Sequence, residues 1–431
     1  MSISDLHSKF KTCSGVTTDT RNIKANSMFF ALKGDKFNAN QFAKDALEKG
    51  AKYAVIDEAE FVLDERFILV EDVLTALQNL AQFHRKTLNI PLIGLTGSNG
   101  KTTNKELLAA VLAKKYKVYA TKGNLNNHIG VPLTLLAIDE SYEIAVVEMG
   151  ANHQKEIELL SNICQPTHGF LTNVGKAHLE GFGGEEGVRK GKGELLDYLA
   201  QTQGTIFINE TISVLMEMAS ERTFKEVILY GNDEKSLEML QESPNIEFQA
   251  KCIEPIKTHL SGKYNFDNMQ TAFAVGLYFG VLPQDAADAI AGYNPDNNRS
   301  QLVQKGSNML ILDAYNANPS SMQASIQNFI NLKTDKKKVI IAGDMFELGD
   351  AAPAEHAELG KLIASGGFDL VVLYGNLMQY ALPSLPTAFY FTDKFSLHNW
   401  LMDKQIRDSY ILIKGSRGVG LESVVPFIER E

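Results

Sequence analysis

The residues whose types and spacing most clearly indicate a chemical role form the run Thr96–Thr103 (TGSNGKTT), between an expected strand and an expected helix. A glycine-rich turn there lets backbone N–H groups converge on phosphate oxygens, and the helix N-terminus adds favourable partial charge. Lys101 would supply a cation to the phosphates, and the Thr102 hydroxyl a ligand to Mg²⁺. A strict P-loop has glycine five residues before Gly100, where this chain has Leu95, so the run is a shorter variant. The nucleotide contacts predicted from this run are Gly97, Ser98, Asn99, Gly100, Lys101, Thr102 and Thr103.

Other polar groups follow other expected strands. Glu148 ends an apolar strand, where it is either an Mg²⁺ ligand at the ligand edge of an open sheet or a surface charge. His178 lies in the loop after the next strand, as a metal ligand, a phosphate partner or a solvated side chain. The run 187–194 (GVRKGKGE) opens a helix with three cations in four residues. That run is either a solvated basic face or charge compensation for a triphosphate.

Three loops near the C-terminus also come directly after expected strands: 312–319 (LDAYNANP), 343–349 (GDMFELG) and 414–418 (KGSRG). The ends of parallel strands meet at one edge of the sheet, so these loops are expected to share its ligand edge. Lys414 and Arg417 have the character of an anion clamp for a carboxylate or phosphate, or of a solvated basic turn.

A scaffold of strands and helices must position these loops, and its pattern changes twice along the chain. Residues 1–88 mix short strands and helices and form a small α/β unit. From residue 90, apolar strands alternate with helices, which predicts a parallel sheet covered on both faces. A polar, Asn-rich linker at 292–300 precedes a second doubly wound unit. The expected strands are 28–32, 53–56, 67–70, 92–96, 117–120, 144–148, 169–171, 205–209, 309–313, 338–342, 370–374 and 410–413. The expected helices include 41–49, 73–86, 265–279, 283–291, 321–332 and 354–365.

The bulk composition is that of a soluble globular protein with several domains: 431 residues, 44% hydrophobic and 22% charged. A net charge of −10 disfavours a nucleic-acid binder. The three scattered cysteines are expected to be reduced, buried thiols. The start has no apolar signal core, and the uncharged run 268–284 is too short to span a bilayer. We therefore expect a cytoplasmic monomer without membrane insertion.

Taken in order, these segments resemble the Mur ligase family of bacterial cell-wall synthesis along essentially the whole chain. The segments are TGSNGKTT, EMGANHQKEI, NVGKAHLEGFGG, VRKGKGE, LDAYNANPSSM, GDMFELGD and KGSRGVGLE. The last three favour the member that joins D-alanyl-D-alanine to a UDP-N-acetylmuramoyl-tripeptide. The resemblance implies three α/β domains. They are an N-terminal UDP-muramoyl-substrate-binding domain (1–88), a central P-loop-type parallel-sheet ATP-binding domain (89–295) and a C-terminal Rossmann-like doubly wound domain (296–431).

The resemblance also implies roles for individual residues. Lys101, Thr102 and Glu148 would hold ATP and one Mg²⁺, and His178 would serve a second Mg²⁺. The family carries a carbamylated lysine that helps to hold this second ion; Lys192 matches it, with Lys190 as the competing choice. Asn265 and Asn268 would meet the adenine, and Arg299 and Asp313 the nucleotide from the C-terminal side. The substrate contacts implied are Thr18, Asp19 and Arg21 for the UDP-sugar, Asn124, Asn126 and Asn127 for the muramoyl group, and Asn316, Asn318, Lys414, Ser416 and Arg417 for the dipeptide.

The function expected from this resemblance is ATP-dependent peptide-bond formation through an acyl phosphate, the last cytoplasmic step of the pentapeptide precursor. Within the enzyme class, the alternatives are a sister ligase adding a single amino acid and a folylpolyglutamate-type ligase. From another class, the alternative is a nucleotide-switched binding module without ligase chemistry. Either meso-diaminopimelate or lysine could be the third residue of the acceptor peptide.

Overall fold

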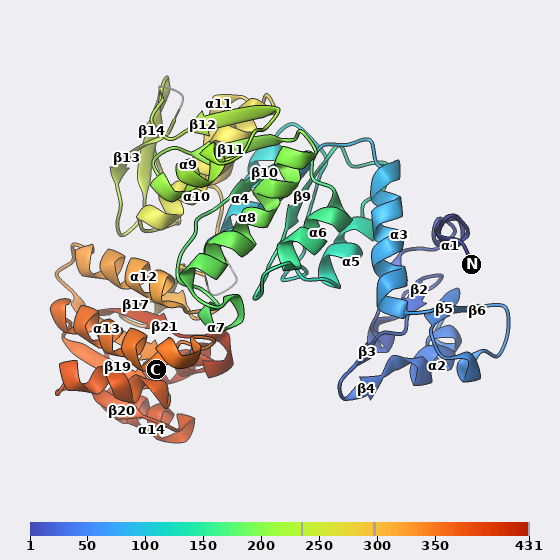
Figure 1. Ribbon diagram of the computed structural model, residues 1–431. Helices are drawn as coiled ribbons and strands as arrows, with labels where there is room; N and C mark the ends of the chain where they lie inside the picture. The colour runs from blue at the N-terminus through green and yellow to red at the C-terminus, as the bar shows by residue number, and fades with distance from the viewer. Residues whose placement is uncertain (234–235, 296–298, 430–431) are drawn as a thin grey trace.

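A computed structural model describes residues 1–233, 236–295 and 299–429 of the chain, which form three bodies in a bent row (Figure 1). The first body holds a parallel sheet of order β1-β2-β5-β6. Its strands are β1 (Val16–Thr17), β2 (Met28–Phe30), β5 (Tyr53–Ile56) and β6 (Phe67–Leu69), with the hairpin β3 (Lys33–Gly34) and β4 (Phe37–Asn38) beside them. Its helices are α1 (Ile3–Phe10), α2 (Ala43–Glu48) and α3 (Val73–Thr87). The helix expected at 41–49 is divided, because a 3₁₀ turn at Ala39–Phe42 precedes α2.

Helix α3 joins the first body to the second. The Asp72 carboxylate caps it by accepting from the backbone N–H of Thr75 at 2.7 Å. The helix packs against α1 on one side and against the central helices α5 (Gly130–Leu136) and α6 (Glu156–Cys164) on the other. At its last turn the buried Arg85 donates to the carbonyls of Cys164 at 3.0 Å and Leu88 at 2.8 Å. These contacts fix the first body to the central one.

The central body contains a six-stranded sheet of order β12-β11-β10-β7-β9-β8, all of whose neighbouring strands are parallel. Alternate residues of each strand face opposite layers of helices. Ile93 and Leu95 face α4, α10 and α11, whereas Leu92 faces the side of α6 and α8. The prediction of a parallel sheet covered on both faces is therefore confirmed. The strands are β7 (Leu92–Thr96), β8 (Val118–Ala120), β9 (Ile144–Glu148), β10 (His168–Leu171), β11 (Thr205–Asn209) and β12 (Glu226–Tyr230). The further helices are α4 (Lys101–Leu112), α7 (Leu179–Phe182), α8 (Glu185–Gln201), α9 (Ser213–Ser220), α10 (Lys263–Tyr278) and α11 (Pro283–Ala291).

A small antiparallel sheet, absent from the sequence-based prediction, extends the central body. It consists of β13 (Glu238–Gln241), β14 (Glu247–Ala250) and β15 (Ile253–Lys257). Only a few side chains of this sheet, such as Phe248 and Ile253, are buried. Most of the others are polar and outside the core, so hydrophobic periodicity gave little sign of it.

The C-terminal body is doubly wound, as predicted, around a sheet of order β16-β17-β21-β18-β19-β20. Helices α12 and α13 cover one face and α14 and α15 the other. The edge strand β16 is antiparallel to β17, which the sequence did not predict, and it continues from the expected linker. Residues 296–298 of that linker, beside the expected boundary at 295, lie outside the described residues. The strands are β16 (Gln301–Lys305), β17 (Asn308–Asp313), β18 (Lys337–Gly343), β19 (Leu370–Tyr374), β20 (Phe389–Phe391) and β21 (Ser409–Lys414). The helices are α12 (Pro319–Asn331), α13 (Ala352–Ser365), α14 (Lys394–Lys404) and α15 (Val425–Ile428).

Two expectations from composition meet different outcomes. The three cysteines are free thiols, but only Cys164 is buried, whereas Cys13 is partly exposed and Cys252 is exposed. The expectation of three buried thiols is therefore wrong for Cys252, which lies on the small antiparallel sheet's last turn at a positive φ of 64°. Within the described ranges, no helix combines the length and the apolar character needed to cross a membrane.

A partly buried histidine at the start of β10 should make stability depend on pH. His168 packs against Phe207 and Phe279, and burial lowers its pKa to about 4. Above pH 6.5 the ring is neutral both folded and unfolded; as pH falls toward 4, the unfolded chain takes up the proton first, and stability is lost. We expect a loss of at most about 3 kcal/mol from this group. Urea unfolding of the wild type and of His168→Phe at pH 7 and pH 4.5 measures it.

The wild type should lose more unfolding free energy than His168→Phe over that pH interval. Replacing the exposed His259 by Phe controls for the removal of a histidine from the same body. An equal pH dependence in the wild type and His168→Phe would contradict the assignment.

Candidate functional site

A cavity of about 730 Å³ lies between the central and C-terminal bodies. Residues from the carboxyl ends of strands in both sheets line it, as expected for open α/β sheets. It is large enough for a nucleotide-sized ligand. Of the residues predicted from the sequence, those lining it are Ser98, Asn99, Gly100, Lys101, Thr102, Thr103, Asn126, Asn127, Glu148, His178, Asn265, Asn268, Arg299, Asp313, Asn316 and Lys414.

The loop between β7 and α4 has the backbone that a phosphate site requires. Gly97 and Gly100 have positive φ values of 148° and 77°, and a Cβ at Gly97 would collide with the Thr172 hydroxyl. The Lys101 ammonium folds back over the loop, donating to the carbonyls of Gly97 at 2.7 Å and Ser98 at 3.3 Å. Burial lowers the pKa of Lys101 to about 8. The loop therefore presents a cation whose partners are its own carbonyls, which an incoming phosphate can replace.

Glu148 is buried beside the loop between β7 and α4, which we call the phosphate loop. Because its side chain is not exposed at the strand end, the surface-charge alternative is excluded. Its Oε1 accepts from Asn126 Nδ2 at 2.7 Å and from the Thr102 hydroxyl at 3.3 Å. Its Oε2 is buried and has no hydrogen-bond partner among the residues that the structure describes. An open carboxylate oxygen next to a hydroxyl suits a hard cation such as Mg²⁺. Among the described residues, no group of three or more Asp, Glu, His or Cys could hold a metal by itself. These ligands therefore fit an ion that completes its shell with phosphate and water, as Mg²⁺ does.

The basic run 187–194 is not a solvated face as a whole. Lys192 is completely buried in α8, where its ammonium donates to the Ala151 carbonyl at 3.1 Å and lies 4.9 Å from the Phe182 ring centre. Burial, reinforced by the charge of Lys101, holds the pKa of Lys192 well below its usual value. Glycines in the run allow this packing, since a Cβ at Gly191 would collide with Phe182. Lys190 is exposed, so of the two candidate lysines only Lys192 is enclosed.

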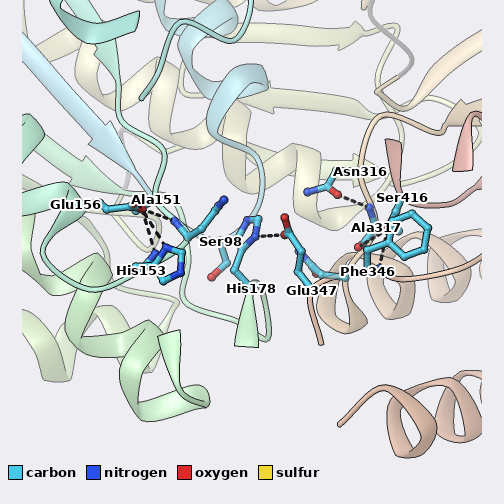
Figure 2. A network of polar contacts seen from close by, with 12 residues as sticks. Ser98, Ala151, His153, Glu156, His178, Asn316, Ala317, Phe346, Glu347 and Ser416 are labelled. Atoms are coloured by element: carbon cyan, nitrogen blue, oxygen red, sulfur yellow. Dashed lines mark hydrogen bonds and ion pairs between the residues drawn. The ribbon is translucent and has the colours of Figure 1, made fainter. Parts of the chain in front are cut away.

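His178 contacts the C-terminal body instead of being solvated. Figure 2 shows its ring and the Glu347 carboxylate pointing toward each other from the two bodies, joined through Nδ1 and Oε2. This contact lowers the pKa of Glu347. The backbone N–H of Glu180 also donates to the Glu347 carbonyl at 3.3 Å. The loop after β10 and the loop after β18 therefore meet across the cavity edge.

The two cations at the end of β21, Lys414 and Arg417, have separate partners. Lys414 is buried, and its ammonium lies 2.6 Å from Asp313 Oδ2. Arg417 is exposed and donates to the Tyr315 hydroxyl at 3.0 Å. The Tyr315 ring also carries the Arg299 guanidinium, whose Cζ is 3.7 Å from the ring centre. The anion clamp predicted for Lys414 and Arg417 therefore stays a prediction, and Asp313 is the present partner of Lys414.

The remaining predicted residues divide into those at the cavity and those away from it. Asn265 and Asn268 are buried at the start of α10, where Asn268 Oδ1 accepts from Asn104 Nδ2 at 2.5 Å. Asp19 and Arg21 form an exposed pair at 2.8 Å in the first body. Ser416 is buried and accepts from the backbone N–H of Phe346 at 3.0 Å (Figure 2). The predicted residues that do not line the cavity are Thr18, Asp19, Arg21, Gly97, Asn124, Lys192, Asn318, Ser416 and Arg417.

Sequence reasoning did not single out two side chains that the structure brings to the cavity. Tyr315 seats Arg299, and the only sequence sign was an aromatic residue inside a polar loop after a strand. Glu156 opens α6 and accepts from the backbone N–H of Asn152 at 2.6 Å. It also accepts from the backbone N–H of His153 at 3.0 Å (Figure 2). It resembles an ordinary first-turn acid, so spacing alone gave no functional signal.

Family models match three consecutive parts of the chain. The Mur ligase family catalytic domain matches residues 12–85, the Mur ligase middle domain matches 95–276, and the Mur ligase glutamate ligase domain matches 298–417. The UDP-N-acetylmuramoyl-tripeptide–D-alanyl-D-alanine ligase of Bacillus subtilis is 37% identical over 421 residues, covering 95% of this chain and 92% of the relative. The Escherichia coli ligase of the same name is 32% identical over 427 residues, covering 96% and 93%.

Solved structures agree with these matches over nearly the whole length. MurF from Acinetobacter baumannii superposes with a TM-score of 0.87 at 28% identity, covering 99% of this chain and 98% of that one. The MurF ligase from Thermotoga maritima in complex with ADP superposes with a TM-score of 0.83 at 25% identity, covering 97% of each chain. The sequence, the three-body fold and the lined cavity lead to one conclusion: the chain belongs to the Mur ligase family.

Proposed function

We propose that this chain uses ATP to join D-alanyl-D-alanine to a UDP-N-acetylmuramoyl-tripeptide. The observation that carries the proposal is that one cavity is shared by two bodies. The phosphate loop, which precedes α4, lines this cavity together with Arg299, Asp313 and Asn316 of the C-terminal body. A nucleotide on the loop and a dipeptide at the C-terminal loops would thus be neighbours. Relatives of this name are similar along more than nine-tenths of the chain.

The proposed chemistry proceeds in two steps. A carboxylate oxygen of the tripeptide attacks the γ-phosphorus of ATP, forming an acyl phosphate as ADP leaves. The amine of D-alanyl-D-alanine then attacks the acyl carbon, and inorganic phosphate leaves as the peptide bond forms. The first step brings two anions together, so positive charge must offset their repulsion. Lys101 and Arg299 line the cavity on opposite bodies and are placed to supply it.

Mg²⁺ is proposed as the metal cofactor. Thr102 and Glu148 would hold one ion, and the partnerless Glu148 Oε2 supports this assignment. When bound, Mg²⁺ neutralises phosphate charge. His178 would serve a second ion with carbamylated Lys192, which requires the imidazole to leave Glu347. The enclosure of Lys192 favours it over Lys190 for this modification.

The three bodies are proposed to divide the substrates. Residues 1–88 would hold the UDP-sugar through Thr18, Asp19 and Arg21, and Asn124, Asn126 and Asn127 would contact the muramoyl group. Residues 89–295 would hold ATP, with the adenine near Asn265 and Asn268. Residues 296–431 would receive the dipeptide near Asn316, Lys414, Ser416 and Arg417. A monomer acting in the cytoplasm without nucleic acid fits this assignment.

A product assay with purified protein tests the proposed function. With ATP, Mg²⁺ and UDP-N-acetylmuramoyl-tripeptide present, we expect amide formation with D-alanyl-D-alanine to exceed that with single amino acids by at least about 100-fold. The reason is that a site built for two residues leaves buried polar groups unpaired when one is missing. Equal use of a single amino acid would indicate a sister ligase. ATP hydrolysis indifferent to every amine would indicate a nucleotide-switched binding module.

A further inference from the structure

We propose that Asn318 is a positioning residue that ties the first turn of α12 to the phosphate loop. Through this tie, nucleotide on the loop would set the position of the C-terminal segment that carries Tyr315 and Asn316. The inference rests on the proposed function, because it assumes that the loop binds ATP. It differs from the dipeptide contact that the sequence suggested for Asn318.

Both ends of the Asn318 side-chain amide make a hydrogen bond. Its Oδ1 accepts from the backbone N–H of Ser321 at 2.8 Å and so caps α12. Its Nδ2 donates to Asn99 Oδ1 at 2.8 Å, across the boundary between the two bodies. The residue is 5% exposed and does not line the cavity. Both contacts are therefore made by a buried amide outside the cavity lining.

The partner, Asn99, is itself held by the loop after β10. Its backbone N–H donates to Asn173 Oδ1 at 3.0 Å, and its carbonyl accepts from the Thr172 hydroxyl at 2.6 Å. The neighbouring N–H of Ser98 donates to the Asn173 carbonyl at 3.1 Å. Phosphate oxygens at such a turn take up backbone N–H groups of this kind. Nucleotide would thus compete with Asn173 and change the restraints on Asn99.

A second, independent connection reaches the same turn of α12. The Ser98 hydroxyl donates to the Gly175 carbonyl at 2.9 Å and accepts from the Gly175 N–H at 3.0 Å. The next N–H, of Lys176, donates to the Ser320 hydroxyl at 2.8 Å. The approach is close, because a Cβ at Gly175 would lie 2.7 Å from Ser320 Oγ. Consecutive residues of the phosphate loop thus connect to Asn318 and Ser320, two residues apart on α12.

The variant Asn318→Ser tests the contact with Asn99 separately from the cap of α12. Serine caps a helix about as well as asparagine, but its hydroxyl is too short to reach Asn99. We expect Asn318→Ser to keep the wild-type melting temperature and affinity for a non-hydrolysable ATP analogue. Its kcat/KM for D-alanyl-D-alanine should fall about 10-fold, a typical size for coupling between two sites. Asn99→Ala removes the same tie from the other side and should show a similar fall, with no further fall in the double variant.

Amide hydrogen exchange in α12 gives a readout that does not depend on the acceptor. In the wild type, the ATP analogue with Mg²⁺ should change the exchange of the first turn of α12, and in Asn318→Ser this response should be smaller, because only the connection through Ser320 remains. An unchanged response in Asn318→Ser would overturn the inference. So would a normal kcat/KM in Asn99→Ala beside a reduced one in Asn318→Ser, because Asn318 would then contact the dipeptide itself. A wild type that binds no nucleotide would instead refute the proposed function.

Discussion

Replacing Lys101 by Ala is expected to reduce ligation by at least about 10³-fold while leaving the fold intact, the size of effect seen when a group that stabilises transferring charge is lost. Lys101 is the cation of the phosphate loop, and its ammonium donates to two carbonyls of that loop. Within the described part of the chain, it has no hydrogen-bond or ion-pair partner outside the loop. Steady-state ligation with ATP, followed as amide product, measures the effect. Circular dichroism and the melting temperature report on the fold.

Lys114→Ala provides a matched control, since Lys114 is exposed just beyond the other end of α4. This variant should ligate at the wild-type rate. Turnover of Lys101→Ala within a few-fold of the wild type would contradict the assignment of the loop to the phosphates. Loss of activity together with loss of the melting transition would show instead that Lys101 supports the fold.

Local signals in the sequence were sufficient to predict most strands of the main sheets in all three bodies. The strands 53–56, 92–96, 144–148, 205–209 and 370–374 have the predicted bounds, because each is a short apolar run with a clear break on both sides. The phosphate loop was predictable for the same reason: its chemistry is encoded in consecutive residues between one strand and one helix. Both features depend on neighbours in the sequence, so they can be read without knowledge of the fold.

Features that depend on distant residues could not be predicted in this way. The sequence of the basic run 187–194 is typical of a solvated face. In the structure, however, Phe182 of α7 packs against Lys192, which is buried. His178 and Glu347 are 169 residues apart in sequence, and nothing near either one signals the contact. Lys414 and Arg417 are close in sequence, yet they have different partners. Lys414 pairs with Asp313, and Arg417 donates to Tyr315. In each case tertiary packing selects one of several partners that the local pattern allows.

The arrangement of charge in the cavity explains why the residues of both bodies matter. Lys101 and the open oxygen of Glu148 belong to the central body, whereas Arg299 on Tyr315 and the Lys414–Asp313 pair belong to the C-terminal body. A triphosphate on the loop would add several negative charges to this space, and the pair at Lys414 is already neutral. The Arg299 guanidinium stacks on the Tyr315 ring. Of the cations in the C-terminal body, we therefore expect Arg299 to offset the phosphate charge.

Replacing Lys192 by Ala is expected to lower kcat at least about 100-fold. The variant would lose a proposed metal ligand, which should cost no less than losing a residue that supports one. The enclosed amine has a pKa held well below its usual value, so its neutral form is available to attack carbon dioxide. In the proposed modification the nitrogen would bond to the carbon and release a proton, which would leave a carbamate with the charge and oxygens of a carboxylate. Formate or acetate added to Lys192→Ala should restore part of the activity by occupying the vacated space.

Lys190→Ala is the matched control, because Lys190 lies on the same helix but is exposed. It should retain activity within a few-fold of the wild type. After equilibration with ¹³C-bicarbonate, a carbamate carbon signal should appear in the wild type and in Lys190→Ala and be missing from Lys192→Ala. A signal lost in Lys190→Ala would move the modification to that residue. Full activity of Lys192→Ala without any added carboxylate would show that the buried amine takes no part in the reaction and serves only the packing between α8 and Phe182.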